Sequence, residues 1–195
     1  MDLPIRVGRL LAEHAQVLKF VTHDTYVLKQ IINASEDIAK SFQNGGKLFI
    51  FGNGGSAADA QHIAAEFVNR FQMDRRPLPA MALTTDTSII TSIGNDFGFE
   101  DIFLRQLQAF GTGKDVAMGI STSGTSENVM LALEWGHKVC FRTIGLLGSG
   151  VLTSVDDICD YVISIPSKTT ARIQEMHILV GHIICELVET IMFSD

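Results

Sequence analysis

Apolar residues along this chain follow two spacings, which predict where helices and strands lie. From about residue 5 to residue 43 they recur at helical spacing, which predicts one or two long helices before any strand. Five later runs are predominantly apolar and predict strands at 47–51, 80–83, 115–120, 141–147 and 161–165. The remaining segments predict a long apolar helix at the C-terminal end and, before it, helices at about 56–71, 86–93, 99–110 and 126–135.

The order of these elements predicts the fold class. Strands that alternate with helices form a parallel sheet covered by helices on both faces, and such strands are apolar throughout. We therefore expect an α/β fold, a three-layer sandwich around a five-stranded parallel sheet, with long N- and C-terminal helices. Because no interdomain linker is evident, residues 1–195 are expected to form a single domain, with a helical segment at about 1–43 and an α/β core at about 44–195.

Two loops at the carboxyl ends of predicted strands are suited to an anion. The first is Gly52-Asn53-Gly54-Gly55-Ser56, in which Ser56 is expected to cap the next helix, and the second runs from Ser121 to Ser126. A small polar loop that leads from a strand into a helix presents unpaired N–H groups at the positive end of the helix dipole. Since the second loop has five hydroxyl residues and no Lys or Arg, we expect it to bind phosphate through hydrogen bonds. The sequence has no Gly-x-Gly-x-x-Gly motif, so no nucleotide cofactor is expected.

A few side chains are candidates for chemistry. His62 and Glu66 lie four residues apart on one helical face, where they either hold a divalent metal, act as acid and base, or form an ordinary surface pair. His182 lies among apolar residues, which fits a catalyst or a core histidine, and His177 is the weaker candidate. Gln174 and His182 are eight residues apart, about 12 Å along a helix. One ion could therefore join both on one straight helix only if both side chains were extended. We therefore expect a site that combines side chains from more than one subunit.

Composition and charge narrow the class of protein. The 195 residues are 46% hydrophobic and 19% charged, which is a globular composition with enough apolar residues for a sizeable core. The net charge is −7 and the only adjacent basic pair is Arg75-Arg76, so we expect no nucleic-acid partner and no membrane partner. Three cysteines without metal-type spacing, no signal-peptide pattern and no apolar run of membrane-spanning length together predict a reduced, cytoplasmic protein.

Four motifs, in this order, resemble those of a known family. They are Gly52–Ser56, Gly94-Asn95-Asp96-Phe97-Gly98-Phe99, Gly119–Ser126 and Arg172-Ile173-Gln174-Glu175-Met176-His177. Alone, Asn95-Asp96 is typical of an ordinary glycine-flanked turn. The ordered set is similar to the sugar isomerase (SIS) family and, within it, to the phosphoheptose isomerases. This resemblance covers about residues 5–192 and implies the flavodoxin-like SIS form of the predicted sandwich.

The resemblance also implies roles for particular residues. The positions that hold the phosphate match Ser121, Thr122, Ser123 and Ser126. Those that line the rest of the substrate site match Asn53, Gly54, Gly55, Ser56, Asn95, Asp96 and Gln174. Those that bind zinc in metal-containing members, one ion per subunit, match His62, Glu66, Gln174 and His182. Glu66 and His182 also match the acid/base pair, and the implied assembly is a homotetramer with interfacial active sites.

The implied activity is the isomerisation of a sugar phosphate in heptose biosynthesis. Sedoheptulose 7-phosphate would become D-glycero-D-manno-heptose 7-phosphate through an enediol. One alternative is a non-catalytic SIS tetramer that binds the bacterial replication initiator protein, a class expected to lack the acid/base pair. Another is an isomerase or sensor for a different sugar phosphate, because a hydroxyl loop recognises phosphate and not the length of the sugar.

Overall fold

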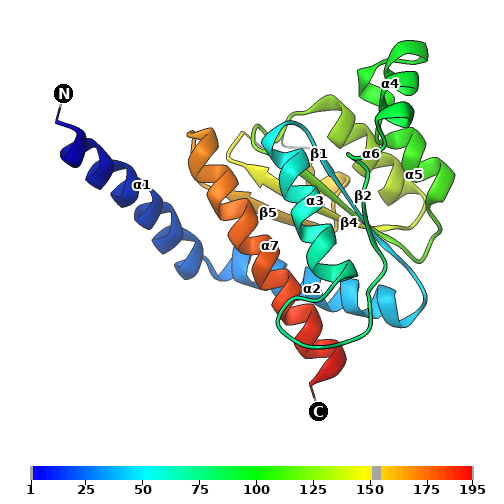
Figure 1. The fold of residues 1–195 in the computed structure, drawn as a ribbon, viewed down its shortest axis with the longest axis horizontal. Helices are drawn as coiled ribbons and strands as arrows, with labels where there is room; N and C mark the ends of the chain where they lie inside the picture. Colours follow the sequence, from blue (N-terminus) through cyan, green and yellow to red (C-terminus); the bar gives the residue numbers. More distant parts are fainter. Residues whose placement is uncertain (1, 151–154, 195) are drawn as a thin grey trace.

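The computed structural model describes residues 2–150 and 155–194, which contain a parallel five-stranded sheet (Figure 1). The strand order is β2-β1-β3-β4-β5, and Met118 of β3 pairs with Ile50 of β1 and with Ile144 of β4. The strands are β1 (Leu48–Gly52), β2 (Ala80–Ala82), β3 (Val116–Ser121), β4 (Arg142–Gly148) and β5 (Tyr161–Ile165). All five predicted strands are confirmed to within one residue at each end.

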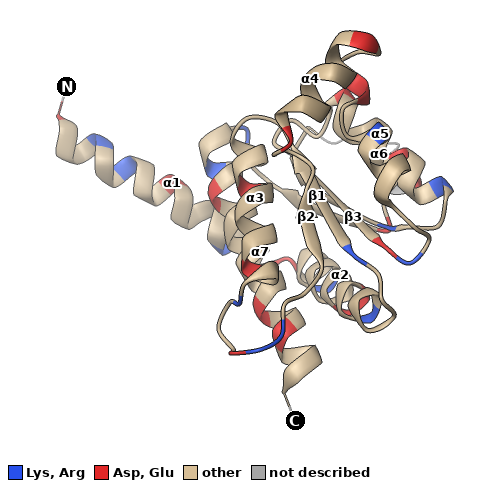
Figure 2. Cartoon of the chain, turned by 45° about the vertical axis from the view of Figure 1, so that its right-hand side comes forward, with Lys and Arg blue, Asp and Glu red and all other residues tan. Residues whose placement is uncertain are grey.

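Charge is nearly absent from these strands, which explains why the sheet can be buried on both faces. Figure 2 shows the charged residues on helices and loops, and among the described strands only Arg142, at the start of β4, is charged. Leu48 and Ile50 belong to the core on one face, whereas Phe49 and Phe51 belong to the core on the other. All four are fully buried, so each face needs a layer of helices.

Helices cover the two faces as separate layers (Figure 1). The layer that packs on Leu48 and Ile50 consists of α2 (Thr25–Gln43), α3 (Gly55–Val68) and α7 (Thr170–Phe193). The layer on Phe49 and Phe51 consists of α4 (Thr87–Asp96), a 3₁₀ turn (Phe99–Asp101), α5 (Leu104–Phe110) and α6 (Glu127–Lys138). A second 3₁₀ turn, Val155–Asp157, precedes β5. The predicted three-layer α/β sandwich is therefore confirmed.

The first predicted helical segment is two helices, and the earlier one, α1 (Leu3–His23), projects from the sandwich (Figure 1). Asp24 separates them, because its carboxylate accepts the N–H groups of Tyr26 and Val27 and so begins α2. Only Val21 of α1 is buried. The exposed apolar side chains of α1 include Leu3, Ile5, Val7, Leu11 and Phe20.

The far end of α4 differs from the prediction. Asn95 and Asp96 were expected in a turn, but they are the last two residues of this helix. The chain leaves the helix at Phe97 and turns at Gly98, whose φ of 132° is open to glycine and strained for other residues. The expected helix at 99–110 is also wrong as one element, since it is divided into a 3₁₀ turn and α5.

The start of α3 differs as well. The residue at the cap is Gly54, with φ of 55°, and the helix begins at Gly55. Ser56 is therefore not the cap but a buried residue of the first turn, where its N–H donates to the carbonyl of Asn53. Glycine reaches this positive φ without the steric cost of a Cβ, which favours Gly54 at this point.

By length and composition alone, α7 could cross a membrane, because an 18-residue window of it has a mean hydropathy of 1.6. The expectation that no apolar run reaches this length is therefore wrong. Burial in the protein core accounts for the apolar composition of α7, because one side of this helix is buried in the core layer that it shares with α2 and α3. A buried helix of this kind meets the same criteria of length and composition.

The buried imidazole of His177, on the inner side of α7, predicts a loss of stability in acid. Burial lowers its pKa to about 4, and the backbone of Leu147 opposes that shift in part. In the unfolded chain a histidine titrates near pH 6.5. The unfolded state alone therefore takes up this proton as the pH falls from about 6.5 to about 4, which lowers the free energy of unfolding by on the order of 3 kcal/mol.

Urea unfolding of the wild type and of His177→Phe at several values between pH 7 and pH 4.5 measures this effect. The wild type should lose stability more steeply than the variant. Equal slopes in the two proteins would contradict the prediction. His23→Phe, a change at an exposed histidine of α1, is the matched control and should retain the wild-type slope.

Candidate active site

Two neighbouring helices, α3 and α7, build the candidate site because two glycines let them pack closely. A Cβ at Gly181 would lie 2.6 Å from Ile63 Cδ1, and a Cβ at Gly55 would lie 2.2 Å from Gln174 Nε2. Both distances are too short for any larger residue without a shift of the neighbour. Gly55 and Ile63 follow each other along α3 as Gln174 and Gly181 do along α7, so the helices run side by side in the same direction (Figure 1).

Three side chains converge between these helices. His62 Nε2 lies 3.2 Å from His182 Nε2 and 3.2 Å from Glu66 Oε1. The possible ligand atoms of all three lie within 4.8 Å of one another. His62 is exposed, whereas Glu66 and His182 are partly buried. One chain therefore brings a carboxylate and two imidazoles together, and neither an isolated surface pair nor a core histidine describes them.

The donor atoms of this cluster, which we call the triad (His62, Glu66 and His182), suit a zinc ion. Imidazole nitrogen and carboxylate oxygen bind zinc at about 2.0–2.2 Å, which places tetrahedral ligand atoms about 3.3 Å apart. Two of the three separations in the triad, both 3.2 Å, fit that value, and the third, between Glu66 and His182, is within 4.8 Å. Gln174, the fourth expected ligand, lies against Gly55 and eight residues from His182, about 12 Å along the helix. Within one chain, three of the four expected ligands are thus together.

An aromatic ring covers His182. The ring of Phe71 stacks on it with 5.4 Å between centroids and 24° between planes. The His62 ring meets His182 edge-on, with 5.0 Å between centroids and 61° between planes. The orientation of the His182 imidazole is therefore set by the ring of Phe71 on one side and by the ring of His62 on the other.

The first glycine loop is connected to the helix that follows the second loop. Asn53 Nδ2 donates to Asn128 Oδ1 at 2.8 Å, and Asn128 Nδ2 donates to Asn53 Oδ1 at 2.9 Å. Gly54 and Gly55 are exposed, and the amide of Gln174 lies beside Gly55. Four of the residues expected around the substrate therefore gather at the start of α3.

The hydroxyl loop is organised around Ser121, the last residue of β3. Its Oγ lies 2.9 Å from Ser126 Oγ and 3.3 Å from Ser123 Oγ, and it accepts the N–H of Gly124 at 3.1 Å. Ser121 is buried, while Ser123 is exposed. Three of the four hydroxyl groups expected to hold phosphate, those of Ser121, Ser123 and Ser126, are therefore close together next to the start of α6.

A cavity of about 390 Å³ adjoins this loop. Thr122 and Ser123 line it from the loop, and Lys168 lines it from the segment after β5. The other lining residues are Ser149, Gly150, Ser167, Thr170 and Ile173. Lys168 adds to this end of the sheet a positive charge that the hydroxyl loop itself lacks.

Asn95 and Asp96 lie elsewhere in the chain. Both are exposed at the end of α4, where Asn95 Nδ2 donates to Asp96 Oδ1 at 2.7 Å. Helix α4 belongs to the helix layer on the opposite face of the sheet from α3 and α7 (Figure 1). Within a single chain, Asn95 and Asp96 therefore do not lie in the same site as the triad.

Burial raises the pKa of two ionisable groups near the triad. Burial raises the pKa of Asp59, one turn before His62, although the charge of His62 opposes the shift. Burial, with a further contribution from Glu66 and Glu189, raises the pKa of Cys185 to about 12. Cys185 is therefore a neutral thiol beneath the site at physiological pH, and it is no nucleophile there.

Three residues of this region were not predicted from the sequence. Asn128 could have been predicted as a site residue, because it is a polar residue in the first turn after a phosphate-type loop. Lys168 could also have been predicted, because it follows the carboxyl end of a predicted strand, where ligands of parallel sheets bind. No sequence pattern predicts the role of Phe71, since only the path of the loop after α3 brings its ring onto His182.

The α/β sandwich, with its hydroxyl loop and triad, is that of a sugar isomerase domain, and sequence comparison agrees. The profile of the SIS domain family matches residues 11–148 of the chain.

Relatives refine this class. The chain is 50% identical over 183 residues to phosphoheptose isomerase 2 of Campylobacter jejuni, covering 94% of this chain and 90% of the relative. It is 51% identical over 185 residues to phosphoheptose isomerase of Aquifex aeolicus, covering 94% and 95%. The solved phosphoheptose isomerase of Neisseria gonorrhoeae superposes with a TM-score of 0.88 at 38% identity, covering 97% of this chain and all of the other. The chain belongs to the phosphoheptose isomerase family of SIS-domain proteins and is an isomerase.

Proposed function

We propose that this protein converts sedoheptulose 7-phosphate into D-glycero-D-manno-heptose 7-phosphate through an enediol. The observation that carries the proposal is the convergence of Glu66 and His182 between α3 and α7. Membership of the isomerase family supports it. A scaffold that only binds another protein has no chemical need for such a pair, so the non-catalytic alternative is not favoured.

The two ends of the substrate would meet different parts of the site. The phosphate would bind the hydroxyl loop, with Ser121, Thr122, Ser123 and Ser126 as donors and Lys168 as a nearby cation. The sugar would extend past Asn53, Gly54 and Gly55 towards the triad, a path that runs along α3. Binding the charged end orients a reactive end that lies far from it.

Proton transfer would be divided between two side chains. The carboxylate of Glu66 would take the proton from the carbon beside the carbonyl group and, from the enediol, return it to the former carbonyl carbon. His182 would move a proton between the two oxygens of the enediol. His62, Glu66 and His182 would hold zinc, one ion per subunit, with Gln174 as the further expected ligand. When bound, zinc supplies Lewis-acid polarisation of the carbonyl oxygen.

A homotetramer with interfacial active sites completes the proposal. The exposed apolar side chains of α1 support it, because a projecting helix with an unburied apolar surface is typical of a site that meets another chain. The position of Gln174 supports it as well, since one chain leaves this residue away from the triad. Asn95 and Asp96 would likewise join a site through a neighbouring subunit.

Incubation with sedoheptulose 7-phosphate, followed by NMR of the sugar products, tests this function. We expect the aldose heptose phosphate to form, to stop forming after treatment with a chelator, and to return when zinc is added. Fructose 6-phosphate serves as the comparison substrate and should react more slowly. Faster reaction of the shorter sugar would contradict the proposed substrate, and full activity in chelator would contradict the zinc requirement.

A further inference from the structure

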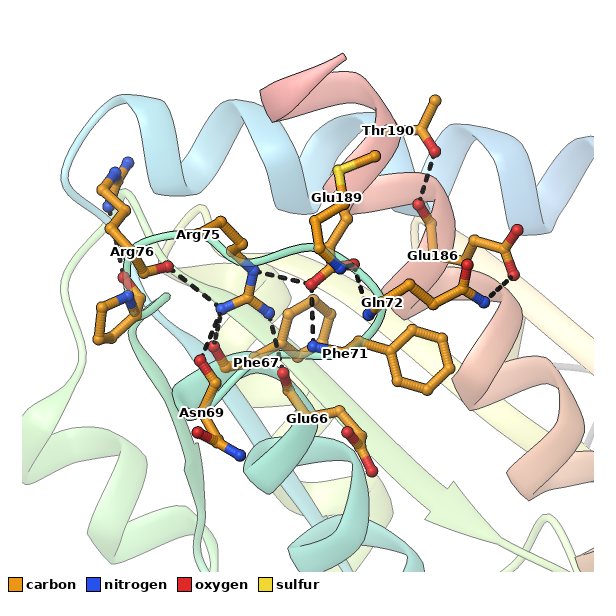
Figure 3. A network of polar contacts seen from close by, with 12 residues as sticks. Glu66, Phe67, Asn69, Phe71, Gln72, Arg75, Arg76, Glu186, Glu189 and Thr190 are labelled. Atoms are coloured by element: carbon orange, nitrogen blue, oxygen red, sulfur yellow. Dashed lines mark hydrogen bonds and ion pairs between the residues drawn. The ribbon is translucent and has the colours of Figure 1, made fainter.

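One buried carboxylate, Glu189 of α7, anchors the loop that leaves α3 (Figure 3). Its side chain is 1% exposed. Oε1 accepts the N–H of Phe71 and the Nε of Arg75, both at 2.9 Å, and Oε2 accepts the N–H groups of Gln72 and Met73 at 2.9 and 3.0 Å. Burial raises the pKa of Glu189, but these donors outweigh burial and hold the pKa below its usual range. The carboxylate is therefore charged and fully engaged.

Arg75 extends this anchor to the end of α3. Its Nη2 donates to the carbonyl oxygen of Glu66 at 2.8 Å, and its Nη1 donates to the carbonyl oxygens of Phe67 and Asn69 at 2.7 and 3.2 Å. Carbonyl groups in the last turn of a helix have no partner within the helix, and a cation is favourable there. Arg75 thus caps the turn of α3 that carries Glu66 (Figure 3).

Phe71 extends the same anchor to the second member of the pair. Its N–H is held by Glu189, and its ring stacks on the imidazole of His182. The position of this ring depends on the loop, and the loop donates four hydrogen bonds to the carboxylate of Glu189. Glu189 is therefore connected to His182 through Phe71 and to Glu66 through Arg75.

We propose that Glu189 and Arg75 are positioning residues for the isomerase site, because their buried ion pair fixes both the backbone of Glu66 and the ring plane of His182. The proposal rests on the proposed function of that pair. The two residues act through others and are not catalytic. A merely structural role, in which Glu189 only stabilises the loop, makes different predictions.

The variant Glu189→Gln tests the proposal in the full-length protein, with Glu186→Gln as the matched control. Glu186 lies one turn earlier on α7, is exposed, and accepts the side-chain amide of Gln72. In Glu189→Gln we expect kcat for sedoheptulose 7-phosphate to fall roughly 10- to 100-fold, with KM little changed and a shifted pH dependence of kcat. The control should keep wild-type values.

NMR of histidine-labelled protein gives a readout that does not depend on turnover. The ring signals of His182 should move in Glu189→Gln and in Phe71→Leu, because the stacked ring shifts them, while those of His23 on α1 should stay in place. If the wild type does not isomerise the sugar but the His182 signals move, the proposed function fails and the positioning contact stands.

A folded Glu189→Gln protein with wild-type kcat, pH profile and His182 signals would overturn the proposal, whatever its melting temperature. If this variant does not fold, Arg75→Lys takes its place, since lysine keeps the cation and loses the fork that reaches Glu66 and Phe67. A fall in kcat with a moved His182 signal supports the proposal, and wild-type values for both contradict it.

Discussion

Glu66→Gln is expected to lose nearly all turnover of the sugar phosphate while it still binds the substrate. Glutamine keeps the size and polarity of the side chain but cannot accept a proton from carbon. A positioned acid or base contributes about 10² to 10⁴ in rate, so kcat should fall by at least the lower value. Because the proposed phosphate contacts lie in the hydroxyl loop, affinity should change far less.

Initial-rate kinetics and calorimetric titration with the substrate measure the two quantities separately. Glu36→Gln, the same change at an exposed residue of α2, is the control and should leave both values unaltered. Wild-type kcat in Glu66→Gln would remove Glu66 from the role of base. Loss of binding together with loss of turnover would place Glu66 in substrate binding instead.

Gly148→Ala should weaken sugar-phosphate binding and destabilise the fold. Gly148 ends β4, and a Cβ there would lie 1.9 Å from the carbonyl oxygen of Thr122 and 3.0 Å from Ile173 Cδ1. Since the nearest atom is backbone, the hydroxyl loop must move to make room. Overpacking of this kind costs about 1–3 kcal/mol or more, and the displaced loop should raise KM by roughly tenfold.

Urea unfolding and KM measurements check both effects. Gly113→Ala is the matched control, because the nearest atom to its new Cβ is 3.7 Å away, an ordinary contact distance. The control should be close to wild type. An unchanged KM in Gly148→Ala would show that the loop does not depend on this contact.

The centre of the sheet was predictable because its strands β1 and β3 are buried on both faces. Residues such as Phe49 and Ile50 point in opposite directions and are both buried, so the strand is apolar without a break and stands out in the sequence. The end of α4 was not predictable in the same way. Glycine favours a break, and this segment contains two glycines. Gly98 adopts a positive φ and ends the turn, whereas Gly94 remains within the helix.

The triad was predictable in part. The spacing of His62 and Glu66 placed them on one helical face, and the family resemblance added His182. Their meeting within one chain depends on the close packing that Gly181 permits, which no local pattern reveals. The expectation that the site combines side chains from more than one subunit therefore concerns Gln174, Asn95 and Asp96, because the triad meets within one chain.

The side-by-side course of α3 and α7 makes this part of the chain intolerant of changes in length. One residue inserted between Gln174 and His182 would rotate everything beyond it by about 100° around the helix axis. The imidazole would then leave His62, and Gly181 would no longer face Ile63. We therefore expect deletions and insertions to be accepted in surface loops, whereas the spacing within these two helices must stay constant for the site to exist.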